Sequence, residues 1–153
     1  MASATAATDT RTVLAFDFGT QRVGVAVGNT ITGVARPLTT IASDANAVRF
    51  AAIEALIDEW RPGTLVVGHP VHADGTPHEM TARAVRFARQ LEGRFGLKVV
   101  CVDERYTTEG ADAMLAAAGV PARERKATRD GVAAQLILQS WFDDPRKRAD
   151  GPA

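Results

Sequence analysis

The chain carries three acidic residues at points where the surrounding sequence predicts the end of a strand or the start of a helix. Asp17 lies within the apolar run LAFDFG, where an unpaired carboxylate is costly to bury. Glu104 ends the apolar run KVVCVDE, and Asp130 lies in the first turn of a helix if Thr128 is its cap. If the three carboxylates converge, they repel one another, and hard divalent cations such as Mg²⁺ or Mn²⁺ relieve that repulsion. Two such ions can activate water for phosphodiester hydrolysis, so convergence of the three residues would suit metal-dependent cleavage of a phosphodiester bond.

Each carboxylate also has a purely structural explanation. Asp17 caps a turn if the glycines around it serve only a hairpin, and Asp130 is stabilised by the helix dipole if it lies in a first helical turn. Asp103, the neighbour of Glu104, can form an ion pair with Arg105 or cap a turn. Strand alternation places Asp103 and Glu104 on opposite faces, so only one of the two can share a cluster with Asp17. Spacing alone leaves both explanations open.

The elements that must position these residues follow from periodicity and turn signals. Three β-type runs joined by short connections favour an antiparallel meander, and two later apolar runs are typical of strands covered on both faces. The predicted strands are VLAFDFG, RVGVAVG, GVARPLTTI, TLVVGHP and KVVCVDE. In the order β-β-β-α-β-α-β-α-α, they predict an α/β fold with a mixed five-stranded sheet and helices on both faces.

Four helices are predicted between and after these strands. Ser43 or Asp44 can cap the first helix, which Pro62-Gly63 then stops. Thr76 and Glu79 form a capping box for the second, with Pro77 in its first turn and Gly96 after its end. The third helix opens at Thr107 or Thr108 and runs to Gly119, and the fourth runs from Thr128 to about Asp143.

Composition limits the classes of protein that fit. The 153 residues are 46% apolar and 24% charged, which suits one soluble globular domain. Eighteen basic and eighteen acidic residues cancel, so any contact with a polyanion needs a local patch or a metal. A lone Cys101 excludes an internal disulfide framework, and no apolar run is long enough to span a bilayer. We expect residues 1–11 and 144–153 to be disordered tails around a domain at 12–143, and a cytoplasmic location.

Two other groups of residues attract attention. The basic connector PARERKAT, which includes Lys126, can contact backbone phosphates, although it can equally be a solvated mobile loop. His69, His72 and His78 lie within ten residues, but without cysteines or a helical HExxH spacing they do not form a recognisable zinc motif.

Four segments, DFGTQRVGVAVG, VVGHPVHADGTP, VDERYTT and KATRDGVAAQLIL, resemble in order and spacing the motifs of the YqgF family. Its members are Holliday junction resolvase-like proteins, also described as nucleases that mature the small-subunit ribosomal RNA precursor. The resemblance covers residues 12–143 and implies a ribonuclease H-like fold. It implies a catalytic, metal-binding triad at Asp17, Glu104 and Asp130 that holds a pair of Mg²⁺ or Mn²⁺ ions. The residues that would position the substrate are Arg22, Arg105, Thr107, Thr108 and, in the basic connector, Lys126. The chain departs from many members at Gly28-Asn29, where an acidic residue is common.

Other functions are weighed against this one. DFGT before a hairpin also resembles the first phosphate loop of actin-like ATP-using proteins, but that fold needs two such domains and 153 residues supply one. A non-catalytic ribonuclease H-like module that binds RNA is the third class, against which the retention of all three acids argues. Within the nuclease class the family favours processing of the 5′ end of pre-16S rRNA, with junction DNA as the alternative substrate. The remaining expectations are a ribosomal subunit as a partner, no membrane contact, and a monomer or homodimer.

Overall fold

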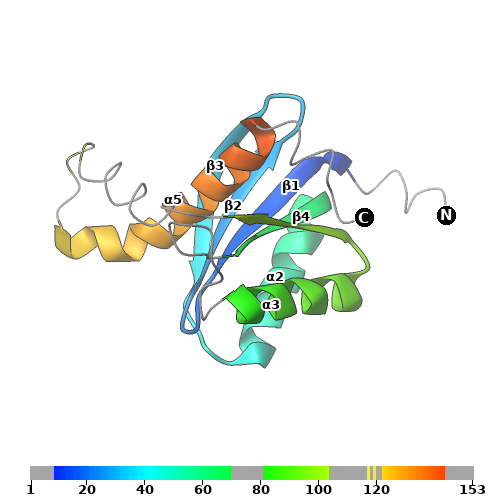
Figure 1. The fold of residues 1–153 in the computed structure, drawn as a ribbon, viewed down its shortest axis with the longest axis horizontal. Helices are drawn as coiled ribbons and strands as arrows, with labels where there is room; N and C mark the ends of the chain where they lie inside the picture. The colour runs from blue at the N-terminus through cyan, green and yellow to red at the C-terminus, as the bar shows by residue number, and fades with distance from the viewer. Residues whose placement is uncertain (1–8, 70–80, 104–116, 118, 120–121, 144–153) are drawn as a thin grey trace.

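The computed structural model describes residues 9–69, 81–103, 117, 119 and 122–143 (Figure 1). Five strands form one mixed sheet, as the sequence predicts, and their order in it is β3-β2-β1-β4-β5. The strands are β1 (Asp9–Phe18), β2 (Val23–Asn29), β3 (Val34–Ile41), β4 (Pro62–His69) and β5 (Lys98–Asp103). The described helices are α2 (Asn46–Trp60), α3 (Thr81–Phe95) and α5 (Ala122–Asp143).

The sheet is mixed, and β1 lies at its centre. The meander of β1, β2 and β3 is antiparallel, whereas β1 pairs with β4 and β4 pairs with β5 in parallel. Parallel neighbours need a crossover between them, and α2 and α3 supply the two crossovers. Consequently β1, β4 and β5 end at the same edge of the sheet, where sites in α/β folds are found.

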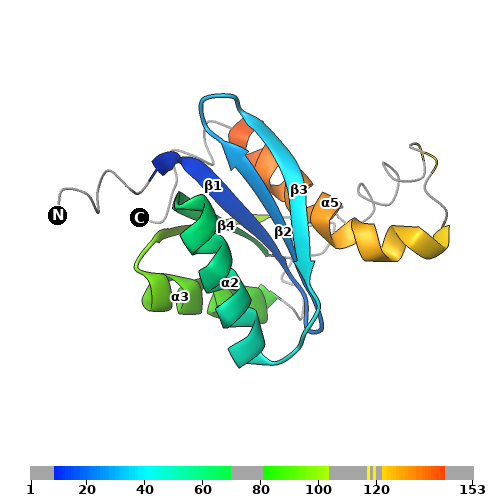
Figure 2. The same ribbon diagram turned by 180° about the vertical axis from the view of Figure 1, so that it is seen from behind.

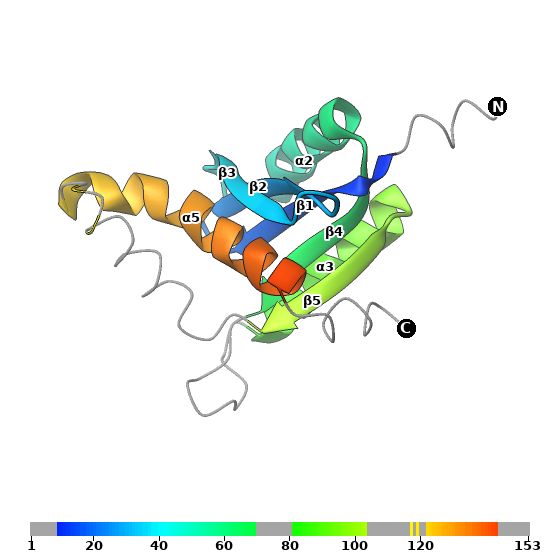
Figure 3. The same ribbon diagram turned by 90° about the horizontal axis from the view of Figure 1, so that it is seen from above.

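Alternation along β1 divides the core into two layers on opposite faces of the sheet (Figures 1 and 2). Leu14 and Phe16 pack with residues of α2 and α3, such as Ile53 and Leu91, on what we call the α2–α3 face. Val13 and Ala15 belong to a second core that α5 completes, and we call this side the α5 face. Figure 3, from above, shows α5 crossing the sheet on the side away from α2.

The start of β1 and the boundaries of α2 differ from the expected ones. β1 begins at Asp9, so residues 9–11 of the expected tail are strand, and the Arg11 carbonyl accepts a hydrogen bond from Thr30 (2.8 Å). Ser43 and Asp44 do not cap α2: the N-cap is Ala45, without a side-chain bond. Instead, the Ser43 hydroxyl accepts a hydrogen bond from the Ala45 amide (3.1 Å) and closes a turn before the helix.

The ends of α2 and α3 are both made by a residue in the left-handed conformation. Arg61 takes φ 51° after α2, and its amide donates to the Ile57 carbonyl (2.8 Å). This single residue turns the chain, so Pro62 already belongs to β4, two residues before the expected start. Gly96 takes φ 65° after α3 and donates to the Glu92 carbonyl (2.9 Å), which confirms its predicted role.

The largest correction concerns α5, which begins at Ala122 and not at Thr128. Residues 122–128 of the basic connector are therefore helical, which agrees with the high helix propensity of Ala, Arg, Glu and Lys. Asp130 lies more than two turns inside α5. A helix dipole acts mainly within the first turn, so it no longer explains the presence of an acid at this position.

Candidate functional site

Asp17 lies at the end of the central strand, on the α5 face, and is partly buried. In the sheet register it stands opposite Gly24 of β2 and beside Gly68 of β4. Both neighbours lack a side chain, so neither adjacent strand places a side chain beside the Asp17 carboxylate on this face. The sheet thus presents the Asp17 carboxylate at its carboxyl edge, between two strands that place no Cβ beside it.

The same register fixes the place of β5 relative to Asp17. Gly68 pairs with both Asp17 and Val102, so Asp17 and Val102 lie on one line across three strands. Adjacent strands are about 4.8 Å apart, so β5 runs roughly 10 Å from β1 at this level. Val100 and Val102 face the core under α5. Asp17 therefore shares the α5 face with Val100 and Val102, whereas position 104 lies outside the described residues.

Contacts along α5 show in which direction this helix crosses the sheet. Phe142 lies against Gly28, and a Cβ added at Gly131 would stand 3.3 Å from the Pro37 side chain. In the ladder, Gly28 of β2 is level with Val13 of β1, whereas Pro37 pairs with Ala26, which is level with Ala15. Moving from Phe142 back to Gly131 thus approaches the end of β1 that carries Asp17. Asp130 immediately precedes Gly131, so α5 brings its backbone toward that end.

Two glutamines fix the position of α5 along the sheet. The Gln139 side chain accepts a hydrogen bond from the Ala35 amide (3.0 Å) and donates to the Gly33 carbonyl (2.8 Å). Gln135 donates to the Ala35 carbonyl (3.1 Å). These contacts satisfy backbone groups of β3 and prevent α5 from sliding, so they also hold the position of Asp130.

Gly28 and Asn29, where an acidic residue is common in the family resembled, have structural roles here. A Cβ at Gly28 would stand 2.6 Å from the Phe142 ring and 2.9 Å from the Val34 carbonyl oxygen, so only glycine allows α5 this close. The Asn29 side chain accepts a hydrogen bond from the Ile31 amide (2.8 Å) and stabilises the β2–β3 turn.

The turn from Gly19 to Arg22 begins two residues after Asp17 and lines a pocket of about 220 Å³. A Cβ at Gly19 would lie 2.7 Å from the Arg22 carbonyl oxygen, so the turn requires glycine. Arg49 of α2 stabilises this turn through hydrogen bonds to backbone carbonyls. Its Nη2 donates to the Gly19 carbonyl (2.6 Å), and its Nε donates to the Ser43 carbonyl (2.5 Å). The guanidinium carbon lies 5.4 Å from the centre of the Phe18 ring. Burial lowers the pKa of Arg49, and the nearby Asp44 carboxylate opposes this shift.

A family model described as "RuvX: Holliday junction resolvase" matches residues 11–144. The chain belongs to the RuvX family. RuvX is another name for the YqgF family expected from the four sequence motifs. The match therefore confirms that expectation and, with it, a nuclease of the hydrolase class.

Two curated relatives of this RuvX chain carry the name "Putative pre-16S rRNA nuclease". The protein of Dechloromonas aromatica is 54% identical over 134 residues, which cover 88% of the chain and 92% of the relative. That of Chromobacterium violaceum is 54% identical over 133 residues, 86% of the chain and 97% of the relative. Among solved structures, Thermus thermophilus RuvC in complex with a Holliday junction substrate matches with a TM-score of 0.53 and 16% identity, over 92% of the chain and 97% of RuvC. This similarity confirms the ribonuclease H-like fold.

Several predicted site residues of the RuvX chain lie outside the described residues. They are Glu104, Arg105, Thr107, Thr108, His72 and His78, together with the side chains of His69, Lys126 and Asp130. Within the part of the chain that the structure describes, no three His, Cys, Asp or Glu side chains gather into a metal-binding group. No described helix is long and apolar enough to cross a membrane. Of the predicted triad, the structure therefore describes the Asp17 side chain and the backbone of Asp130.

The sequence interpretation missed Arg49. Its side chain is only 3% exposed, and no other charged side chain in the described part of the chain is buried. A signal was present, because Arg49 precedes Ile53 by four residues and falls on the apolar stripe that continues to Trp60. A charged residue on a buried helical stripe indicates a specific partner, which here is the backbone of the turn beside Asp17.

Proposed function

We propose that this RuvX chain is a divalent-metal-dependent endonuclease that matures the 5′ end of pre-16S rRNA. Membership of a nuclease family supports the reaction class, and the names of the curated relatives support the substrate. The observation that carries the proposal is the position of Asp17, a carboxylate at the carboxyl end of the central strand with glycines on both sides. A Holliday junction is the second candidate substrate, favoured by the description of the family model.

The residues that would hold the metal are Asp17, Glu104 and Asp130. Their carboxylate oxygens are hard donors that suit Mg²⁺ or Mn²⁺, and the neighbours of Asp17 on both adjacent strands, Gly24 and Gly68, add no side chain that would compete for the ion. When bound, a pair of such ions supplies activation of water and stabilisation of the leaving oxygen.

Basic and hydroxyl side chains would orient the substrate in this site. Arg22 is the last residue of the turn that begins at Gly19, two residues after Asp17, and would contact a backbone phosphate beside the cleaved bond. Arg105, Thr107, Thr108 and Lys126 are proposed for the same role from their sequence positions. Because basic and acidic residues balance over the whole chain, such local contacts have to supply the attraction for a polyanion.

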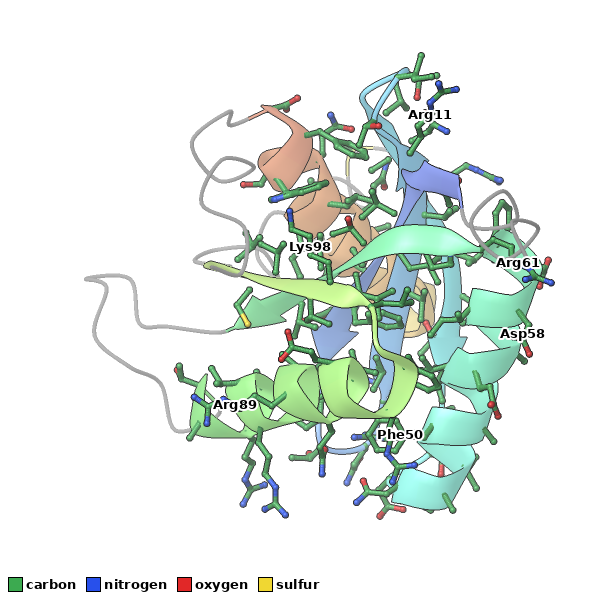
Figure 4. The ribbon with its side chains drawn as sticks, turned by 90° about the vertical axis from the view of Figure 1, so that its right-hand side faces the viewer. Arg11, Phe50, Asp58, Arg61, Arg89 and Lys98 are labelled. Atoms are coloured by element: carbon green, nitrogen blue, oxygen red, sulfur yellow. The ribbon has the colours of Figure 1, made fainter. Side chains whose placement is uncertain are left out.

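The decisive experiment compares Asp17→Asn with Asp58→Asn. Asp58 lies on the exposed side of α2, away from the sheet edge, and the substitution removes the same charge (Figure 4). Labelled pre-16S rRNA and a four-way DNA junction are incubated in parallel with each protein and Mn²⁺. We expect Asp17→Asn to lose more than the roughly 10–100-fold that removal of an outer-shell metal partner costs, and to remain folded. A folded Asp17→Asn protein that cleaves at the unaltered rate would show the metal-site assignment to be wrong.

A calorimetric titration with Mn²⁺ separates the nuclease from a non-catalytic RNA-binding module. A nuclease should bind Mn²⁺ with an affinity that depends on Asp17 and not on Asp58. A module that only binds RNA should show no such dependence, because it has no use for a metal at these carboxylates.

The setting of the reaction is also part of the proposal. We place the chain in the cytoplasm, where precursor ribosomal RNA and ribosomal subunits are its partners. A monomer suffices to trim RNA, whereas resolution of a four-way junction needs two active sites that act together. Sedimentation of the chain with and without each substrate therefore distinguishes the two candidate substrates independently of cleavage.

A further inference from the structure

Helix α3 carries a concentration of positive charge on its exposed side. Its 15 residues contain four arginines and a single acid, Glu92; the arginines are Arg83, Arg86, Arg89 and Arg94. All four are exposed, while Phe87 and Leu91 of the same helix are buried in the core of the α2–α3 face. The helix thus presents a local basic surface in a chain whose total charge is zero.

Two of these arginines line a pocket at the sheet edge. The pocket measures about 350 Å³, and its described lining is Phe18, Asn46, Arg83, Arg86, Phe87 and Gln90. The Phe18 and Phe87 rings form its apolar wall, with their centres 4.9 Å apart. The described lining contains two guanidinium groups and two amides but no carboxylate, so its polar groups favour an anion.

The position of the pocket relates it to the candidate site. Phe18 is the residue after Asp17, and strand alternation directs the two side chains to opposite faces at the same sheet edge. The thickness of one packed layer is about 10 Å, and a nucleic-acid strand carries a phosphate about every 3.4 Å along its axis. A strand that crosses the sheet edge can therefore place one phosphate at Asp17 and others, a few nucleotides away, at the pocket.

We propose that the Arg83–Arg86 pocket binds backbone phosphates of the nucleic acid on the side of the cleaved bond that lies over the α2–α3 face. This inference rests on the proposed function and extends it to a second contact region. Arginine forks suit phosphate oxygens, and the Asn46 and Gln90 amides add neutral donors. Contacts of this kind set the register of the strand on the protein and carry no sequence information.

Arg89 provides a matched control on the same helix. It lies near Cys101 of β5, where it lowers the pKa of the thiol while burial, the larger effect, raises it. Arg89 is not part of the pocket lining, and Figure 4 shows it on α3. Arg89→Ala thus removes one charge from α3 without removing a pocket residue.

The experiment measures binding of labelled single-stranded RNA and of a four-way DNA junction by fluorescence anisotropy, without metal, across a range of salt concentrations. For Arg83→Ala/Arg86→Ala we expect the slope of log K against log salt to become shallower by about 1.4 with RNA and about 1.8 with the junction arms, since two phosphate contacts are lost. Arg83→Lys/Arg86→Lys should restore most of the slope, and Arg89→Ala should leave it unchanged.

Three results overturn the inference: an unchanged slope in the double alanine variant, an equal change in Arg89→Ala, or no binding of either probe by the unaltered chain. Because binding is measured without metal, failure of the proposed function is distinguishable. Normal binding and slope changes without cleavage by the unaltered chain, in the Mn²⁺ assay, refute the nuclease assignment and leave the pocket as a phosphate-binding surface.

Discussion

Replacement of Arg49 by methionine should destabilise the protein and impair catalysis more than binding. The guanidinium donates to the Gly19 and Ser43 carbonyls and lies over the Phe18 ring. Methionine keeps the unbranched apolar stem and loses all three interactions. Because the Gly19 turn begins two residues after Asp17, removal of the Arg49 hydrogen bonds should displace the residues of the candidate site.

The magnitude follows from opposing contributions. Hydrogen bonds from a charged donor contribute about 1.5–3 kcal/mol each, and a cation over an aromatic ring about 0.5–2 kcal/mol. These favourable contributions are opposed by the cost of removing the guanidinium from water, because Arg49 is only 3% exposed. The same burial lowers the pKa of Arg49. We therefore expect a net loss of roughly 2–3 kcal/mol, which for a chain of this size lowers Tm by about 4–12 °C.

Urea unfolding of Arg49→Met and of Arg94→Met measures the effect. Arg94 is the matched control because its guanidinium lies 4.1 Å from the centre of the Phe50 ring but the residue is exposed. Arg94→Met should lose only about 0.5–1 kcal/mol. The loss of stability in Arg49→Lys should lie between those of Arg49→Met and Arg94→Met, because an ammonium group keeps the positive charge but lacks the two separate guanidinium donors. If Arg49→Met unfolds at the same urea concentration as Arg94→Met, the turn does not depend on Arg49. In the cleavage assay, kcat should fall and KM should change little.

Two further substitutions test how α5 is seated. Gly28→Ala should lower the free energy of unfolding by about 1–3 kcal/mol, because its Cβ meets the Phe142 ring and the Val34 carbonyl. The control Gly93→Ala, on the open side of α3, should be neutral or raise the free energy of unfolding by about 0.5–1 kcal/mol. Equal unfolding midpoints for the two variants would contradict the close approach of α5 to Gly28. Gln139→Ala should lose about 1–3 kcal/mol and speed hydrogen exchange of the Ala35 amide. Gln139→Glu keeps the acceptor for that amide but loses the donor to the Gly33 carbonyl and the Asp143 carboxylate, so it should lower stability while it protects the Ala35 amide better than alanine does. Unchanged exchange at Ala35 in Gln139→Ala would argue against the contact.

The sheet and its two faces were predictable because short-range periodicity dictates them. Alternation in VLAFDFG places Val13 and Ala15 on one face and Leu14 and Phe16 on the other, and helical spacing places Phe87 and Leu91 on one stripe of α3, which agrees with the two cores observed. These patterns depend only on which side chains avoid water, and such information is local.

The errors occurred where two local signals competed. Thr128 has the residue type of a cap, but the helix formers before it extend α5 back to Ala122. Ser43 likewise has the residue type of a cap, yet its hydroxyl bonds the Ala45 amide before the helix starts. End signals are worth about 1 kcal/mol, so packing and propensity over a whole helix readily outweigh them.

The candidate site was predictable only in part. The sequence placed Asp17 at a strand end, and the register adds the two glycines beside it. Arg49 was missed because its partners are backbone carbonyls, 30 residues away at Gly19 and six at Ser43, and carbonyls leave no trace in a sequence pattern. The roles of Glu104, Arg105, Thr107, Thr108 and Lys126 remain predictions.

The hydrogen bonds between α5 and Ala35 also bear on how the protein avoids aggregation. An outermost strand with open amide and carbonyl groups is a template on which another chain can add a strand. At Ala35 both groups are already bonded to glutamine side chains, so the β3 border is closed to intermolecular pairing at that point. At the opposite border, β5 has only six residues and begins with the exposed Lys98, whose charge discourages stacking of copies. The helix that carries Asp130 thus also protects the sheet against aggregation.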